Sequence, residues 1–235
     1  KIVNDMQILS NPDRIKLYYD EVALWKTKHH YYYLENKLEF LNSQNEWYYD
    51  KENNYIYVRL KDDLDPNLNN IRVKIKPYVL NLNNANNSKI ENINFFATTL
   101  RVHNSDSVDI KNCNFYYPSS YAHMLNEINP GEEIDPSINQ VFNTMTKITG
   151  SSNNCRFYQC AFRYTDGPAL EIYGGNNILE DNYFSYIDKT VANLSSVMTT
   201  IRMNGNNNLL KNNTFYKTAA SSTLNSGNAA IIEYN

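Results

Sequence analysis

One short phrase recurs through the second half of the chain, and it restricts the fold more than any other feature of the sequence. The phrase ends each time in a phenylalanine: Phe95, Phe115, Phe162, Phe184 and Phe215. An apolar residue stands five places earlier: Ile90, Ile110, Phe157, Leu179 or Leu210. The phenylalanines are 20, 47, 22 and 31 residues apart. A repeat of about twenty residues with insertions of variable length is typical of a solenoid, in which each unit buries its inner face against its neighbours.

A second set of stretches alternates between charged and apolar residues. L-R-V-H-N, T-K-I-T-G, L-E-I-Y-G and I-R-M-N-G precede four of the phrases, and I-E-Y-N ends the chain. Alternation with a period of two predicts strands whose charged residue points to solvent. These residues form one predicted column: Arg101, Lys147, Glu171, Arg202 and Glu233. Three glycines follow the charged residues, where we expect a turn with positive φ: Gly150, Gly174 and Gly205.

The two sets of stretches alternate along the chain. One unit is therefore a strand, a turn, a second strand and a looser return, which predicts an all-β parallel β-helix. Inward side chains fill the core of such a solenoid. Any active site is therefore expected on the outside of the coils.

Length and charge restrict the class of protein further. The chain has 235 residues and a formal net charge of −3. This length suits one domain with a substantial core, and the negative charge gives no support to a nucleic-acid partner. No apolar run approaches the length of a membrane span, and the opening Lys1-Ile2-Val3-Asn4 has no signal-peptide pattern. The chain stops at Tyr234-Asn235 inside an expected strand, so we expect an excised or processed fragment.

In four of the five phrases asparagine or cysteine stands two residues before the phenylalanine, and in the first phrase Ile93 stands there. Asn182 and Asn213 share this position, and equivalent amides one coil apart can form a hydrogen-bonded ladder. Cys113 and Cys160 stand at the same place in other coils, so we interpret them as core thiols that pack like small hydrophobic residues. Three cysteines are an odd number and indicate no disulfide framework.

The first eighty residues follow a different pattern. Aromatic alternation on both sides of a polar Lys-Glu-Asn-Asn turn, in E-W-Y-Y-D and Y-I-Y-V-R-L, predicts a β-hairpin, and the alternation continues over 71–75. The apolar spacing in residues 5–26 is compatible with a short helix or irregular packing. We therefore divide the chain into an N-terminal segment, 1–80, and β-helix coils, 81–235, with a long insertion at about 116–145.

The order of these patterns resembles a known group of proteins. E-W-Y-Y-D, a turn, Y-I-Y-V, an alternating strand and Asn-rich coils ending in N-x-F are similar to right-handed parallel β-helix proteins of the pectate-lyase-like superfamily. The likeness covers roughly residues 31–217, and the E-W-Y-Y-D segment resembles bacterial β-helix glycoside hydrolases. The resemblance implies a right-handed solenoid, a polysaccharide partner and an extracellular or cell-surface location. The superfamily also contains lyases, epimerases, tailspikes and adhesins, so the fold alone does not fix the chemistry.

Two aspartates are the first candidates for catalysis. Asp166 and Asp188 each lie four places after a phenylalanine of the phrase, which predicts one column in adjacent coils. One strand spacing approaches the roughly 5 Å between the carboxylates of a retaining glycosidase. Glu171, on the exposed strand face, is the third candidate. Aspartates before a strand also commonly fix turns, and calcium bridging the pair is a further alternative; no cofactor is otherwise predicted.

Candidates for substrate binding come from the charged column and from tyrosines. Arg101, Lys147 and Arg202 either form an exposed salt-bridge ladder with the glutamates or bind uronates or sulfates. In a lyase, such basic residues would remove a proton beside a carboxyl group. We assign Tyr121, in the insertion, and Tyr173, in L-E-I-Y-G, to sugar contacts. The sequence thus favours a glycoside hydrolase, with a lyase or epimerase, or a non-catalytic glycan-binding module, as alternatives.

Overall fold

The computed structural model describes residues 3–9, 15–19, 37–50, 52–74, 76, 78–119, 145–165, 167–187, 199–218 and 222–235. Within these ranges the chain forms two compact units, one up to Val73 and one from Lys74 onward. Strands make up nearly all of the regular structure in the described residues. The helices found there are three short 3-10 turns: η2 (Leu38–Phe40), η3 (Lys61–Asp63) and η4 (Pro66–Leu68).

The first unit contains two antiparallel strand pairs. Strand β3 (Glu46–Asp50) pairs with β4 (Tyr55–Arg59), which confirms the predicted hairpin. Strand β1 (Val3–Ile8) pairs with β2 (Ile15–Tyr19), so the expectation of a helix or irregular packing is wrong for these residues. The β-branched and aromatic residues of these two strands favour strand formation. A comparison with helical spacing could not detect that β2 pairs with β1. Residues 71–74 are not a strand; the next one begins at Tyr78.

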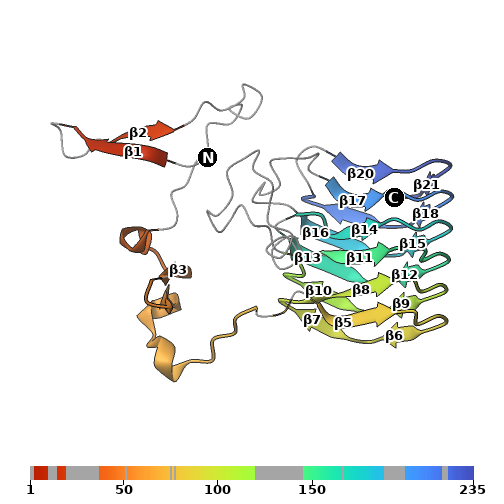
Figure 1. Ribbon diagram of the computed structural model, residues 1–235, viewed down its shortest axis with the longest axis horizontal. Helices are drawn as coiled ribbons and strands as arrows, with labels where there is room; N and C mark the ends of the chain where they lie inside the picture. The colour runs from red at the N-terminus through yellow and green to blue at the C-terminus, as the bar shows by residue number, and fades with distance from the viewer. Residues whose placement is uncertain are drawn as a thin grey trace. The chain divides into compact units, whose positions relative to one another are not determined.

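The second unit is a parallel β-helix built from three stacked sheets, and Figure 1 shows its coils in chain order from β5–β7 to β20 and β21. We name each sheet by its first strand. The β5 sheet contains β5 (Tyr78–Asn83), β8 (Thr99–His103), β11 (Thr146–Thr149), β14 (Leu170–Ile172), β17 (Thr199–Met203) and β20 (Ser222–Ser226). The β6 sheet contains β6 (Lys89–Glu91), β9 (Asp109–Lys111), β12 (Arg156–Tyr158), β15 (Ile178–Glu180), β18 (Leu209–Lys211) and β21 (Ile231–Glu233). The β7 sheet contains β7 (Asn94–Phe96), β10 (Asn114–Tyr116), β13 (Ala161–Thr165), β16 (Tyr183–Ile187) and β19 (Thr214–Tyr216).

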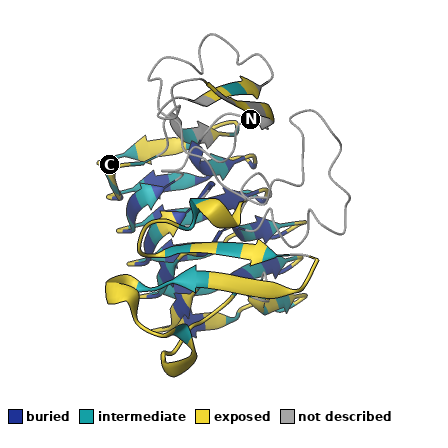
Figure 2. Ribbon diagram, turned by 90° about the vertical axis from the view of Figure 1, so that its left-hand side faces the viewer, coloured by how far each residue is buried: buried dark blue, intermediate teal, exposed yellow. Residues whose placement is uncertain are grey.

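The register of the sheets confirms the recurring phrase. Its five phenylalanines are mutual partners along the β7 sheet, and consecutive rings stack with centroids 4.6, 4.6, 5.0 and 5.1 Å apart. The apolar residues five places earlier are partners along the β6 sheet. Inward positions of the middle coils are fully buried, as the dark blue segments of Figure 2 show. The core of the solenoid is therefore the set of columns that the repeat predicts.

Asparagine supplies three of the six turn residues between the β6 and β7 sheets, in addition to the predicted ladder. The residue directly after each β6-sheet strand has a positive φ of 49–60°: Asn92, Asn112, Gln159, Asp181, Asn212 and Tyr234. Asn and Asp tolerate this left-handed conformation better than most residues. The high asparagine content thus has a conformational cause that the ladder alone does not cover.

The predicted ladder lies inside the coils and extends beyond the predicted pair. Asn182 donates from Nδ2 to Asn213 Oδ1 at 3.0 Å, and Asn213 donates to Asn235 Oδ1 at 2.8 Å. Each of these amides also donates to a backbone carbonyl of the preceding coil, as Asn182 does to Phe157 O at 3.0 Å. Cys113 and Cys160 continue the column as buried free thiols, which confirms their assignment to the core.

The glycines at the turns have two different causes. Gly150 has a φ of +66°, as predicted, whereas the prediction of positive φ is wrong for Gly174 and Gly205. At those two positions a Cβ atom would lie within 2 Å of a backbone oxygen of the neighbouring coil. Close approach between coils, rather than turn conformation, requires glycine there.

Candidate functional site

The charged column predicted from the sequence lies on the outer face of the β5 sheet. Arg101, Lys147, Glu171 and Arg202 are partners in consecutive strands, and the column continues to Asn81 on β5 and to Asn225 on β20. The structure thus brings together four of the five residues that the sequence placed in this column.

Glu233 does not belong to this column. It lies on β21 of the β6 sheet, opposite Lys211. The final residues I-I-E-Y-N occupy the place of L-L-K-N-N one coil earlier, with Ile232 opposite Leu210. Alternation identified the strand but not its sheet, since charged residues alternate with apolar ones in both.

Glu171 is the most enclosed charged group of the column. Its side chain is 7% exposed and lies between Lys147 Nζ at 3.4 Å and Arg202 Nη1 at 3.7 Å. The Tyr173 hydroxyl donates to Glu171 Oε1 at 3.1 Å. Burial, and then the neighbouring carboxylate, raise the pKa of Tyr173. This carboxylate therefore fixes two cations and one phenol in place.

Arg101 is held by two residues of the preceding strand, β5. Its guanidinium lies over the Tyr78 ring, 5.6 Å from the centroid, and its Nε donates to Asn81 Oδ1 at 3.1 Å. Burial raises the pKa of Tyr78 to about 12, against the opposing effect of Arg101. Because the next residue of the column is Lys147, two cations are direct neighbours, an arrangement that costs free energy in a sheet.

The β6 sheet provides a contrast on the same solenoid. Its outer column reads Glu91, Lys111, Tyr158, Glu180, Lys211 and Glu233, so the charges alternate in sign wherever they are neighbours. Lys211 Nζ lies 3.8 Å from Glu233 Oε1, and Glu180 accepts from Arg156 at 2.6 Å. This sheet fits the ladder interpretation of paired charges, whereas the β5 sheet carries three cations for one carboxylate.

The predicted catalytic aspartates, Asp166 and Asp188, and the predicted sugar contact Tyr121 lie outside the described residues. The residues directly before the aspartates, Thr165 and Ile187, are register partners in β13 and β16. The sequence spacing that placed Asp166 and Asp188 in adjacent coils therefore matches the register of the strands that precede them. Along the chain, each strand of the β7 sheet is followed by a strand of the β5 sheet, which carries the charged column. We call the end of the β7-sheet strands the β7–β5 corner.

Sequence reasoning missed an aromatic row at the same corner. Tyr117, Tyr164 and Tyr186 each lie two places after a core phenylalanine, with φ between 53° and 59°. Their rings stack at 5.3 and 5.1 Å, with interplanar angles of 22° and 18°. Because the ring faces cover one another, the row presents ring edges and hydroxyls to solvent. This arrangement suits packing between coils better than stacking against sugar rings. Extending the alignment of the phrases by two residues beyond the phenylalanine would have revealed this row.

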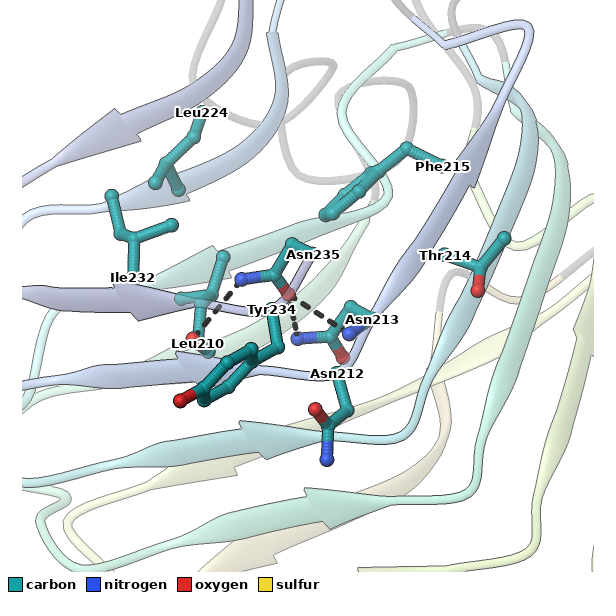
Figure 3. A pocket seen from close by; sticks show the side chains of 9 residues that line it. All are labelled: Leu210, Asn212, Asn213, Thr214, Phe215, Leu224, Ile232, Tyr234 and Asn235. Carbon is teal, nitrogen blue, oxygen red and sulfur yellow. Dashed lines mark hydrogen bonds between the residues drawn. The ribbon is translucent and has the colours of Figure 1, made fainter.

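A hollow of about 680 Å³ lies at the last coil and is a separate feature. Figure 3 shows its lining, with Leu224 and Ile232 on the left of the view, Phe215 at the upper right and the hydrogen-bonded Asn213–Asn235 amide pair between them. Its lining combines inward residues of the last coils with the exposed Asn212, Thr214 and Tyr234, and it contains no residue of the charged column. We interpret it as the open end of the core.

The fold defines the class of protein: an all-β parallel β-helix with an outward charged column. Comparison with family models, with curated proteins and with solved structures found no match to this chain. None of the described helices is long and apolar enough to span a membrane.

Proposed function

We propose that this protein binds an acidic polysaccharide along the outer face of the β5 sheet and cleaves it by hydrolysis. The observation that carries the proposal is the pair of neighbouring cations, Arg101 and Lys147, in a column whose single carboxylate is already enclosed by Lys147 and Arg202. A chain with a net charge of −3 has no general need for such a cationic stripe. Uronate or sulfate groups would neutralise it.

The shape of the column favours a polymer over a small anion. Cationic side chains occupy three of the consecutive strands β8, β11, β14 and β17, so anionic groups spaced along one chain can meet them in turn. Arg101 is fixed by Asn81 and Tyr78, and Arg202 by Glu171. Cations that are already ordered lose less conformational entropy when a ligand binds.

Hydrolysis is assigned to Asp166 and Asp188. The pairing of Thr165 with Ile187 supports their placement one coil apart, about 4.8 Å, which is close to the separation in retaining glycosidases. Two carboxyl groups at this distance raise each other's proton affinity. One then donates a proton to the glycosidic oxygen while the other attacks the sugar carbon, and water afterwards releases the sugar. Glu171 assists by holding the cations that orient the substrate.

The resemblance of the E-W-Y-Y-D segment to β-helix glycoside hydrolases supports the same proposal, and on the same ground we propose an extracellular or cell-surface location. A second candidate is a polysaccharide lyase. In that reaction a basic residue of the column, Lys147 or Arg101, removes the proton beside a uronate carboxyl group and the glycosidic oxygen leaves, which creates a carbon–carbon double bond. The neighbouring cations are the observation that favours this candidate. A non-catalytic glycan-binding or adhesin module is the third.

The test compares wild type with Asp166→Asn and Asp188→Asn on uronate-containing, sulfated and neutral polysaccharides. Reducing ends and the ultraviolet absorbance of unsaturated sugars are followed together. We expect new reducing ends without absorbance, on acidic substrates, and their loss in either variant. Absorbance that survives both substitutions would show a lyase instead. Binding without cleavage would leave a glycan-binding module, and equal binding of neutral and acidic polymers would contradict the role of the cations.

A further inference from the structure

Two buried cysteines occupy neighbouring coils of the solenoid. Cys113 and Cys160 directly precede Asn114 and Ala161, which are register partners, and Ala161 N donates to Cys113 O at 2.9 Å. Both residues are free and 1% exposed. The two side chains therefore point inward from equivalent positions of consecutive coils.

The separation of these positions suits a covalent bond. Strands of one sheet lie about 4.8 Å apart, within the roughly 4.4–6.8 Å between the Cα atoms of disulfide-bonded cysteines. The Cys160 thiol reaches toward the coil of Cys113, since its Sγ donates to Ile110 O at 3.5 Å. A hydrogen bond from Cys160 lowers the pKa of Cys113, and the same bond raises that of Cys160.

The third cysteine lacks such a partner. Cys155 is also buried and free, but its column neighbours are Val108 and Asn177. Its Sγ donates to the backbone carbonyls of Ser105 and Asn153, and burial raises its pKa. The chain therefore contains an internal control of the same residue type in the same core.

We propose that Cys113 and Cys160 form an oxidation site, at which a peroxide joins two consecutive coils through a disulfide. The Cys113 thiolate attacks one peroxide oxygen, the oxygen–oxygen bond breaks, and Cys113 becomes a sulfenic acid as the first water leaves. The Cys160 sulfur then attacks the Cys113 sulfur and expels the second water with the Cys160 proton. Two thiols and one hydrogen peroxide thus give one disulfide and two waters.

The bond would close the chain between residues 113 and 160. This loop includes residues 120–144, which lie outside the described residues. A cross-link around a loop of this length removes conformations from the unfolded chain. The disulfide therefore acts as a staple between the coils that flank residues 120–144, and it leaves the outer charged column unchanged.

The experiment treats the folded full-length chain with hydrogen peroxide, alkylates the remaining thiols after unfolding, and maps linked peptides without reduction. We expect wild type to pass from three titratable thiols to one, with Cys113 and Cys160 linked. Cys155→Ser is the matched control and should pass from two to none. Cys113→Ser and Cys160→Ser should form no internal disulfide. The oxidised wild type should unfold at a higher temperature than the reduced form, and dithiothreitol should reverse the shift.

Two results would overturn the proposal. One is the retention of all three thiols in the folded protein under conditions that oxidise the denatured chain. The other is a disulfide that includes Cys155, or a mixture of pairings like that of the denatured chain. Both are read from wild type alone, so they hold even where a serine variant fails to fold.

Discussion

Replacing Asn182 by alanine tests the internal amide ladder. This side chain is 1% exposed, and its Oδ1 accepts from Cys160 N at 2.9 Å. Its Nδ2 donates to Phe157 O and to Asn213 Oδ1, both at 3.0 Å. Alanine therefore leaves one buried N–H without an acceptor and removes two further hydrogen bonds.

The magnitude follows from these contacts. An orphaned buried donor costs about 1–3 kcal/mol and each lost hydrogen bond about 0.5–1.5 kcal/mol, so we expect a loss of about 2–6 kcal/mol in the free energy of unfolding. For a domain of this size that corresponds to a fall in Tm of roughly 5–20 °C. The variant should still bind polysaccharide at low temperature, because the ladder lies inside the coils.

The matched control is Asn114→Ala. Asn114 also belongs to an amide ladder, donating to Asn94 Oδ1 at 2.9 Å, but this pair lies on the outer face. Water replaces its hydrogen bonds, so we expect a loss below about 1 kcal/mol. Urea unfolding followed by circular dichroism measures both variants. Equal losses in the two variants would refute the reasoning, because burial would then not decide the contribution of an amide.

Three further predictions address charge, packing and pH. Glu171→Gln leaves two enclosed cations without their carboxylate and should lower the free energy of unfolding in urea by about 3 kcal/mol. Glu180→Gln, on the more exposed β6 sheet, should lower it by less than about 1 kcal/mol. Similar losses in the two variants would contradict the contrast between the sheets. Phe162→Ala, in the middle of the ring stack, should cost about 3–5 kcal/mol and Phe215→Ala, at its half-buried end, clearly less, measured in the same way. Because the pKa of Tyr78 is raised in the folded protein, its neutral phenol stabilises the fold at pH values below the ordinary tyrosine pKa, and stability should decline as pH rises from about 10 to about 12. Tyr78→Phe should abolish the highest step of the phenolate absorbance titration. An unchanged titration would show that Tyr78 ionises normally.

The sequence predicts the inward columns well because burial repeats from coil to coil through the middle of the solenoid. Phe162 and Phe184 occupy equivalent places because each coil needs one large ring against the next, and Asn213 lies opposite Asn182 for the same geometric reason. The same regularity exposes the error at Glu233. Ile232, the apolar residue before Glu233, is the register partner of Leu210. Aligning the two stretches on these apolar residues, instead of on the charged ones, places Glu233 opposite Lys211.

Other features depend on contacts that no local pattern contains. Gly174 is required by a carbonyl oxygen of another coil, and Tyr78 joins Arg101 from the preceding coil. Four residues of the outer column could be predicted from the sequence. The enclosure of Glu171 by Lys147 could not, because side-chain reach decides it. The roles of Asp166 and Asp188 stay predictions, since both lie outside the described residues.

The most direct test of the central claim measures the affinity for a uronate-rich polysaccharide at low and high salt. The account predicts that the double variant Arg101→Gln, Lys147→Met loses about tenfold or more in affinity, since hydrogen bonds to charged groups contribute about 1.5–3 kcal/mol each. It also predicts that the salt dependence of binding weakens in this variant. Lys211→Met, on the paired β6 sheet, should bind like wild type. Equal affinity of the double variant and wild type, or an equal loss in Lys211→Met, would contradict the assignment of the outer β5 sheet as the binding surface.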